Sequence, residues 1–115
     1  GYKVRGKTKK DEEQLIADAI AIEKAGAFAI VIEGVMSDVA QKITQAVKIP
    51  TIGIGAGNVT DGQVLVWSDM LGFFESFKPK FVRHYLNGAQ LVKDAVNQYR
   101  SDVQDKSFPS KEEEY

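Results

Sequence analysis

Hydrophobic residues recur at the spacing of an α-helix in the first half of the chain. The pattern predicts one helix from Asp11 to about Gly26 and a second from Ser37 to Lys48. The first helix opens on three acidic residues, which suit the positive end of a helix dipole, and glycine is common just after a helix ends. Serine is a good helix starter, and Pro50 stops the second helix from continuing.

The same reasoning predicts two later helices and three strands. Apolar residues at helical spacing indicate a long amphipathic helix over residues 89–104 and a short helix over residues 78–86, KPKFVRHYL. The run AFAIVIE (27–33) is rich in β-branched residues and does not alternate, which is typical of a strand covered on both faces. TIGIG (51–55) and QVLVW (63–67) read as a second and a third strand.

The order of these elements predicts an α/β fold. Helix, strand, helix and strand follow one another over residues 11–55, which implies parallel strands joined by a right-handed crossover. Only about seven residues separate the second and third strands, whereas a crossover normally takes at least about ten. We therefore expect either a single helical turn around residues 58–61 or a helix in place of the third strand.

Composition narrows the classes of protein. The 115 residues, 43% hydrophobic and 27% charged, fit one globular unit with a modest core. A net charge of −1 favours no nucleic-acid partner, and no apolar run approaches the roughly 20 residues that cross a bilayer. Because there is no cysteine and one histidine, disulfides are excluded and structural zinc is disfavoured. We expect a cytoplasmic protein that binds neither nucleic acid nor membrane.

The two ends of the chain carry opposite charges. Residues 1–10 lack apolar periodicity and contain five basic side chains, while Glu112–Glu114 are acidic. We interpret both as solvated segments: a loop at the start, and a tail from about Lys106.

Parallel α/β folds place functional groups at the carboxyl ends of their strands, and three positions qualify here. They are Glu33, the GIGAGN turn (53–58), and Ser68 with Asp69. Glu33 ends an apolar run, so we expect its carboxylate to be partly desolvated, which makes it a stronger base near neutral pH. The alternative is a glutamate in a salt bridge, or one that caps the helix beginning near Ser37.

The glycine turn suggests a nucleotide site, but the dinucleotide fingerprint fails because Asn58 stands at its third glycine position. Gly53, Gly55 and Gly57 leave room for a tight turn or for a substrate above the strand end, so Gly53 and Gly55 are candidate substrate contacts. The alternative function is a noncatalytic α/β fragment or an anion-binding module that uses the Gly53–Gly57 turn.

The remaining polar and aromatic residues give weaker signals. Asp69 is a polar strand end, a helix cap or an active-site group. His84 is the only histidine and has no serine or cysteine nucleophile nearby, so we interpret it as a surface residue. Four aromatic residues read as core or interface rather than as a base-stacking platform, because no basic stripe is interleaved with them: Trp67, Phe73, Phe74 and Phe77.

Four segments together resemble the carboxyl-terminal half of ketopantoate hydroxymethyltransferase. They are GYKVRGKT, AIVIEGVMSDVAQKIT, IPTIGIGAGNVTDGQVLVWSDMLG and KPKFVRHYL, so the similarity extends from Gly1 to about Pro109. The long glycine-containing segment, together with a glutamate that ends the preceding strand, makes the resemblance specific. Family members usually have cysteine and proline where this chain has Gly34 and Met36, and histidine is common in place of Ser68.

The resemblance implies a (β/α)8 TIM barrel. Residues 1–105 would be the carboxyl-terminal portion of that single domain, with three parallel strands, their helices and further carboxyl-terminal helices, and residues 106–115 would be a tail. The implied reaction transfers a hydroxymethyl group from 5,10-methylenetetrahydrofolate to 3-methyl-2-oxobutanoate, giving 2-dehydropantoate (ketopantoate), in the first step of pantothenate biosynthesis. The glutamate matching Glu33 is the family's catalytic base. Mg²⁺ is the implied cofactor, with its ligands in the missing amino-terminal half and none in this chain.

A complete barrel has eight strands and about 250 residues, whereas three strands are predicted here. A partial barrel leaves strand edges and apolar helix faces uncovered. We therefore expect the amino-terminal half of the same enzyme to be a partner, together with copies of the chain in a homo-oligomer, and we expect the chain alone to be inactive. A sequence that starts at Gly1 rather than at methionine agrees with a missing upstream segment.

Overall fold

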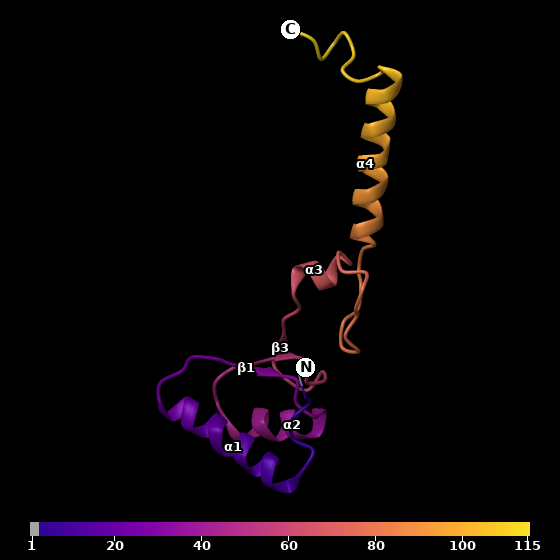
Figure 1. Cartoon of the computed structure of the whole chain (residues 1–115). Helices are drawn as coiled ribbons and strands as arrows, with labels where there is room; N and C mark the ends of the chain where they lie inside the picture. The colour runs from indigo at the N-terminus through magenta and orange to yellow at the C-terminus, as the bar shows by residue number, and fades with distance from the viewer. Residues whose placement is uncertain (1–2) are drawn as a thin grey trace. The chain divides into compact units, whose positions relative to one another are not determined.

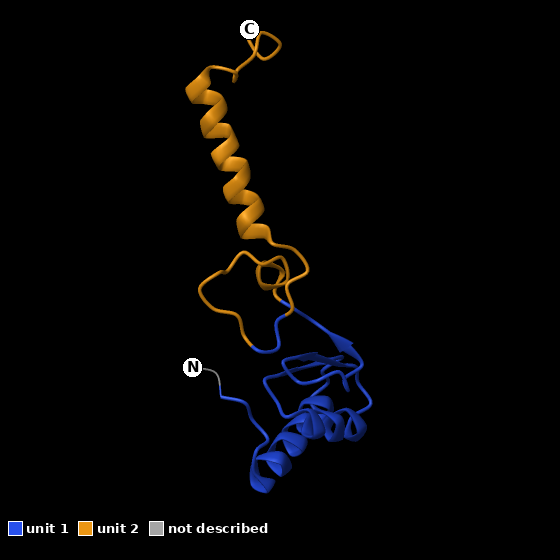
Figure 2. Cartoon of the chain, turned by 90° about the vertical axis from the view of Figure 1, so that its right-hand side faces the viewer, with its two compact units in different colours: residues 1–65, 80–82 blue, residues 66–79, 83–115 orange. Residues whose placement is uncertain are grey.

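The computed structural model describes residues 3–115 and divides the chain into two compact units (Figure 2). Unit 1 comprises residues 1–65 and 80–82, and unit 2 comprises residues 66–79 and 83–115. The elements follow the order α1, β1, α2, β2, β3, α3, α4 (Figure 1). Among the described residues, no helix is both long enough and apolar enough to span a bilayer. That residues 1–105 belong to one barrel domain stays a prediction.

Helix α1 (Lys9–Lys24) begins two residues before the expected start at Asp11. The reason is Thr8, whose hydroxyl accepts a hydrogen bond from the Asp11 N–H (3.2 Å) and so caps the first turn. Gly26 has a φ of 96° and occupies the left-handed position after the helix, as predicted. The loop predicted over residues 1–10 is therefore wrong for its last two residues, and its first two lie outside the described part of the chain.

Three parallel strands form the sheet of unit 1, in the order β1 (Ile30–Glu33), β2 (Thr51–Ile54) and β3 (Gly62–Gln63). Helix α2 (Ser37–Ala46) connects β1 to β2 and starts where it was predicted. The register pairs Ile30 with Thr51 and Glu33 with Ile54, so the carboxyl ends of β1 and β2 lie side by side. The predicted parallel α/β fold is confirmed.

The third strand is shorter and earlier than predicted: it covers residues 62–63 rather than 63–67, and residues 58–61 form no helical turn. A side-chain link takes the place of a crossover helix. The Asp61 carboxylate accepts hydrogen bonds from the Thr51 N–H (2.8 Å) and hydroxyl (3.0 Å), and the Asp61 N–H donates to Thr51 Oγ1 (3.2 Å). These bonds satisfy the fully buried Thr51 and return the chain to the sheet in fewer residues than a helix needs.

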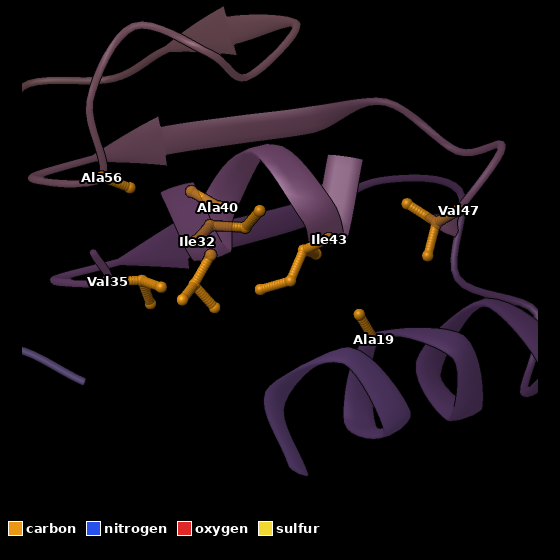
Figure 3. Close-up of a cluster of buried hydrophobic side chains, with 8 residues drawn as sticks. Ala19, Ile32, Val35, Ala40, Ile43, Val47 and Ala56 are labelled. Atoms are coloured by element: carbon orange, nitrogen blue, oxygen red, sulfur yellow. The ribbon is translucent and has the colours of Figure 1, made fainter. Parts of the chain in front are cut away.

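The core of unit 1 lies between β1 and the two helices α1 and α2, which cover one face of the sheet (Figure 3). Figure 3 shows Ile32 of β1 among Ala40 and Ile43 of α2, with Ala19 of α1 below them. The remaining buried members are Val35, Val39, Val47 and Ala56. The helical spacing seen in the sequence thus marks the core face of α1 and α2.

The opposite face of β1 is open within unit 1. Ile32 is 4% exposed, whereas its neighbour Val31 is 59% exposed. Side chains alternate between the two faces of a strand, so Val31 and Glu33 lie on the face away from Ile32. The prediction of a strand covered on both faces is wrong for this chain, because both helices of unit 1 pack on the same face.

Unit 2 contains the short helix α3 (Trp67–Met70) and the long helix α4 (Gly88–Asp105). The long helix was predicted over residues 89–104, but the short helix predicted over residues 78–86 is wrong, because residues 71–87 form neither helix nor strand. Val82 is buried within unit 1, whereas the Tyr85 N–H donates to the Met70 carbonyl within unit 2 (2.7 Å). These separate demands prevent one continuous helix.

Helix α4 carries an apolar stripe that the described residues leave largely uncovered. Five of its residues at helical spacing are exposed: Leu91, Val92, Val96, Tyr99 and Val103. The first turn is buried at Gly88 and Ala89, and Phe108 packs edge-on against the Tyr99 ring, with the ring centroids 5.5 Å apart. Within the described chain, α4 is therefore an amphipathic helix whose apolar face is mostly without a partner.

Candidate functional site

Glu33 is the last residue of β1, at the carboxyl end of the sheet. Its side chain is exposed on the open face, next to Val31. Within residues 3–115 the Glu33 carboxylate takes part in no hydrogen bond or ion pair, so neither the salt-bridge reading nor the capping reading describes it. The expected desolvation is not present in this chain, because nothing in unit 1 covers that face. The carboxylate is free to meet a substrate or a further part of the protein.

The turn after Glu33 is fixed by backbone hydrogen bonds on both sides. The Gly34 N–H donates to the Ile54 carbonyl of β2 (2.9 Å). On the other side, the Arg5 N–H donates to the Gly34 carbonyl (2.8 Å), and the Met36 N–H donates to the Arg5 carbonyl (3.0 Å). Gly34 itself has a φ of 61°, a conformation that glycine adopts without strain. The backbone that carries Glu33 is thus held between β2 and the start of the chain.

The glycine turn lies at the neighbouring strand end, and its glycines are required by packing. A Cβ added to Gly53 would lie 2.7 Å from Thr60 Oγ1 and 3.2 Å from Gln63 Nε2. Gln63 Nε2 also donates to the Gly57 carbonyl (2.8 Å) and to Thr60 Oγ1 (3.0 Å). In this chain, side chains from the segment after the turn, Thr60 and Gln63, fill the space above Gly53.

The other two glycines of the turn have positive φ and close neighbours. At Gly55 (φ 63°) a Cβ would lie 3.0 Å from the Phe81 ring, and at Gly57 (φ 77°) it would lie 2.2 Å from Ser37 Oγ. The close contact at Gly57 brings the turn against the start of α2. These contacts support the tight-turn reading of the three glycines, and a substrate contact at Gly53 or Gly55 stays a prediction.

The third predicted strand-end pair, Ser68 and Asp69, does not follow a strand. Both residues lie in α3, in unit 2, because the third strand ends at Gln63. His84 is exposed, as expected for a surface residue, and lies in the irregular segment before α4 rather than on a helix. The structure therefore brings Glu33 and the glycine turn together in unit 1 and places Ser68 and Asp69 in the other unit.

A family model matches nearly the whole chain. The model of the ketopantoate hydroxymethyltransferase family matches residues 1–111 of the chain. The chain belongs to the ketopantoate hydroxymethyltransferase family. Its three parallel strands with helices are consistent with part of a TIM-barrel enzyme.

Curated relatives carry the name 3-methyl-2-oxobutanoate hydroxymethyltransferase. The one from Aliarcobacter butzleri (strain RM4018) is 86% identical over 115 residues, which is all of this chain and 43% of that protein. Relatives from a Nitratiruptor species and from Helicobacter pylori (strain Shi470) are 62% and 56% identical over the same span, again 43% of each protein. The chain therefore covers less than half the length of these family members.

The described residues do not provide a metal site by themselves. Over residues 3–115, no three histidine, cysteine, aspartate or glutamate side chains come close enough together to hold an ion. Magnesium prefers several oxygen ligands, and one isolated carboxylate at Glu33 does not satisfy that preference. The Mg²⁺ implied by the family thus does not fit the residues of this chain alone.

The residues that sequence reasoning missed are Arg5 and Asp11. Arg5 was interpreted as part of a solvated basic segment, yet its backbone pairs beside Val35 and its guanidinium binds the Asp11 carboxylate. The available signal was the spacing of Thr8 and Asp11, which resembles a helix capping motif. That motif predicts where α1 starts, but not that Asp11 reaches back to the segment beside Glu33.

Proposed function

We propose that this chain is the base-bearing portion of a ketopantoate hydroxymethyltransferase. The proposed reaction transfers a hydroxymethyl group from 5,10-methylenetetrahydrofolate to 3-methyl-2-oxobutanoate and gives 2-dehydropantoate. Membership of the family supports the reaction class, and the relatives' printed names state the activity. The single observation that supports a role for this chain is the exposed Glu33 carboxylate at the carboxyl end of β1, where parallel barrels place their catalytic groups.

The proposed chemistry begins with removal of a proton. The Glu33 carboxylate takes the proton from C3, next to the ketone of the keto acid, and the C–H electron pair becomes an enolate. C3 then forms a bond to the methylene carbon of the folate, and water supplies the hydroxyl group on that carbon. The two C–N bonds of the methylene bridge break, and the two nitrogens take up the proton removed from C3 and the remaining proton of the water, so that tetrahydrofolate leaves. Glu33 must release its proton before the next turnover. Among the described residues of unit 1, no group that could stabilise the enolate converges on Glu33, and we expect such groups from the rest of the enzyme.

The open face of β1 supports a further part of the same enzyme as the partner. Val31 is exposed there, and the matched relatives are more than twice as long as this chain. Covering that face would desolvate Glu33 as the apolar run predicts, which would strengthen it as a base. We expect the chain alone to be inactive for this reason.

The uncovered apolar stripe on α4 supports association of copies of the enzyme. Native mass spectrometry of the complete enzyme would detect such a homo-oligomer.

A chimera tests the catalytic assignment. This chain replaces the matching 115 residues of the Aliarcobacter butzleri relative, and formation of 2-dehydropantoate is measured with and without the substitution Glu33→Gln. A general base contributes about 10²- to 10⁴-fold to a rate, so a loss of at least about 100-fold in kcat is expected. Glu13→Gln is the matched control, because Glu13 is an exposed glutamate on α1. If Glu33→Gln is as active as the control, the assignment of the base is wrong.

A further inference from the structure

Arg5 occupies the position of an additional strand beside the turn that follows Glu33. Its backbone forms a parallel bridge with Val35, through the bonds to Gly34 (2.8 Å) and Met36 (3.0 Å). These bonds restrain the turn on the side that β2 does not reach. Any movement of Arg5 would therefore shift the peptide groups directly after Glu33.

Asp11 connects this segment to helix α1. Its two carboxylate oxygens each accept a hydrogen bond from Arg5 Nε (3.1 Å), and a second guanidinium nitrogen of Arg5 also donates to it. The same carboxylate accepts a hydrogen bond from the Gly6 N–H (2.6 Å). Asp11 thus binds both the side chain of one residue and the backbone of the next.

The two ends of this connection are firmly placed. Asp11 lies in the first turn of α1, where its N–H donates to the Thr8 hydroxyl (3.2 Å). Gly6 lies against Val39 of α2, and a Cβ there would be 3.0 Å from a methyl group of that fully buried side chain. The segment therefore has little freedom to move toward the core or away from α1.

We infer that Asp11 is a positioning residue for Glu33, acting through Arg5 and Gly6 on the turn that carries the base. This inference rests on the proposed function of Glu33. A base must come within about 3 Å of the proton it removes, and a displacement of about 1 Å can lower a rate about 100-fold. Asp11 does not touch the substrate in this scheme, so its effect falls on proton removal more than on binding.

The chemistry of the side chain explains why an aspartate serves here. The Arg5 guanidinium and the Gly6 N–H hold the pKa of Asp11 at about 2, so the carboxylate is ionised at ordinary working pH. An ionised carboxylate accepts from the planar guanidinium at both oxygens, whereas asparagine offers only one oxygen. Asp11→Asn keeps the size of the side chain and loses that two-point contact.

The test measures proton removal separately from the complete reaction. The chimera is incubated with 3-methyl-2-oxobutanoate in D₂O without folate, and deuterium uptake at C3 is followed by proton NMR. Asp11→Asn is expected to lower the maximal exchange rate about 10- to 100-fold and to change the keto-acid concentration at half-maximal rate by less than about threefold. Circular dichroism confirms that each variant is folded at the assay temperature.

The matched control is Glu12→Gln, the next residue of α1. Glu12 pairs with Lys9 and Lys42 (2.9 Å each) and makes no contact with the turn after Glu33, so it reports the general effect of losing ion pairs on this helix. Arg5→Lys is a second variant. Lysine keeps the positive charge but loses the two-point contact with the Asp11 carboxylate. If Asp11→Asn does not fold, the exchange rate of Arg5→Lys tests the positioning role instead.

The outcomes separate the inference from the proposed function. Exchange that is lost in Glu33→Gln, lowered in Asp11→Asn or Arg5→Lys and unchanged in Glu12→Gln supports the positioning role. Exchange lost in Glu33→Gln but equal to wild type in the Asp11 and Arg5 variants overturns the inference while the proposed function stands. Equal losses in Asp11→Asn and Glu12→Gln also overturn it, because the effect is then only structural. Undiminished exchange in Glu33→Gln contradicts the proposed function itself.

Discussion

The contact between Gly6 and Val39 allows a prediction whose magnitude follows from the geometry. Gly6 has a φ of 84°, and an added Cβ would lie 3.0–3.3 Å from three side-chain atoms of Val39. The left-handed backbone costs an L-residue about 1–2 kcal/mol. Overpacking against a buried side chain costs about 1–3 kcal/mol more. Gly6→Ala is therefore expected to lower the free energy of unfolding by about 2–5 kcal/mol.

Three further variants separate the backbone cost from the overpacking cost. At Gly26 the φ is 96° and no atom lies within 4 Å of the added Cβ, so Gly26→Ala should show only the backbone cost of about 1–2 kcal/mol. Val39→Ala alone leaves a cavity and should cost about 2 kcal/mol. In the double variant Gly6→Ala/Val39→Ala the smaller side chain relieves the overpacking. The combined loss should therefore be smaller than the sum of the two single losses by about 1–3 kcal/mol.

Equilibrium urea unfolding of the chain, followed by far-ultraviolet circular dichroism, measures these differences. The expected result for each variant is a lower urea midpoint with an unchanged slope, since none of these substitutions alters the exposed surface much. Two results would refute the reasoning. One is a loss at Gly6 no larger than the loss at Gly26. The other is a double variant whose loss equals the sum of the single losses to within about 0.5 kcal/mol.

Two other predictions concern the start of α1. Because the pKa of Asp11 is lowered from 3.8 to about 2, its stabilising contribution is complete above the ordinary pKa and is lost as the pH falls toward about 2. Between about pH 4 and pH 2, the free energy of unfolding of the Asp11→Asn variant, measured with urea, should therefore change less with pH than that of wild type. Identical pH profiles of the two proteins would contradict this reasoning. Thr8→Ala removes the hydroxyl that caps α1 and should lower the free energy of unfolding by about 1 kcal/mol. Thr8→Ser keeps a capping hydroxyl and should therefore retain most of that stability. Equal thermal stability of the two Thr8 variants would mean that the hydroxyl does not cap the helix.

Local patterns predicted the elements that hold unit 1 together. The spacing of Val39, Ile43 and Val47 marked the buried face of α2, and Gly26 marked the end of α1, because each signal depends on residues close in sequence. The apolar run ending at Glu33 correctly indicated β1 and the strand-end position of the acid. The same run also predicted a strand covered on both faces, which is wrong here because no element of unit 1 covers the face of Val31 and Glu33.

The errors share a physical cause, which is contact between residues distant in sequence. The third strand was placed too late because the bonds between Thr51 and Asp61 shorten the connection, and a side-chain link of this kind leaves no periodic signal. The helix predicted over residues 78–86 does not form, because both of its ends belong to unit 2 while its middle, residues 80–82, belongs to unit 1. Arg5 was interpreted as solvated because nothing in the sequence around a single basic residue indicates that its backbone pairs with Val35.

Complementation tests the central claim most directly. This chain and the unmatched remainder of the Aliarcobacter butzleri relative are produced separately and mixed, and formation of 2-dehydropantoate is measured with 5,10-methylenetetrahydrofolate, 3-methyl-2-oxobutanoate and Mg²⁺. The account predicts no product from either piece alone, product from the mixture, and at least about 100-fold less product when the chain carries Glu33→Gln. Product formed at the same rate with Glu33→Gln, or by the remainder without this chain, would contradict it.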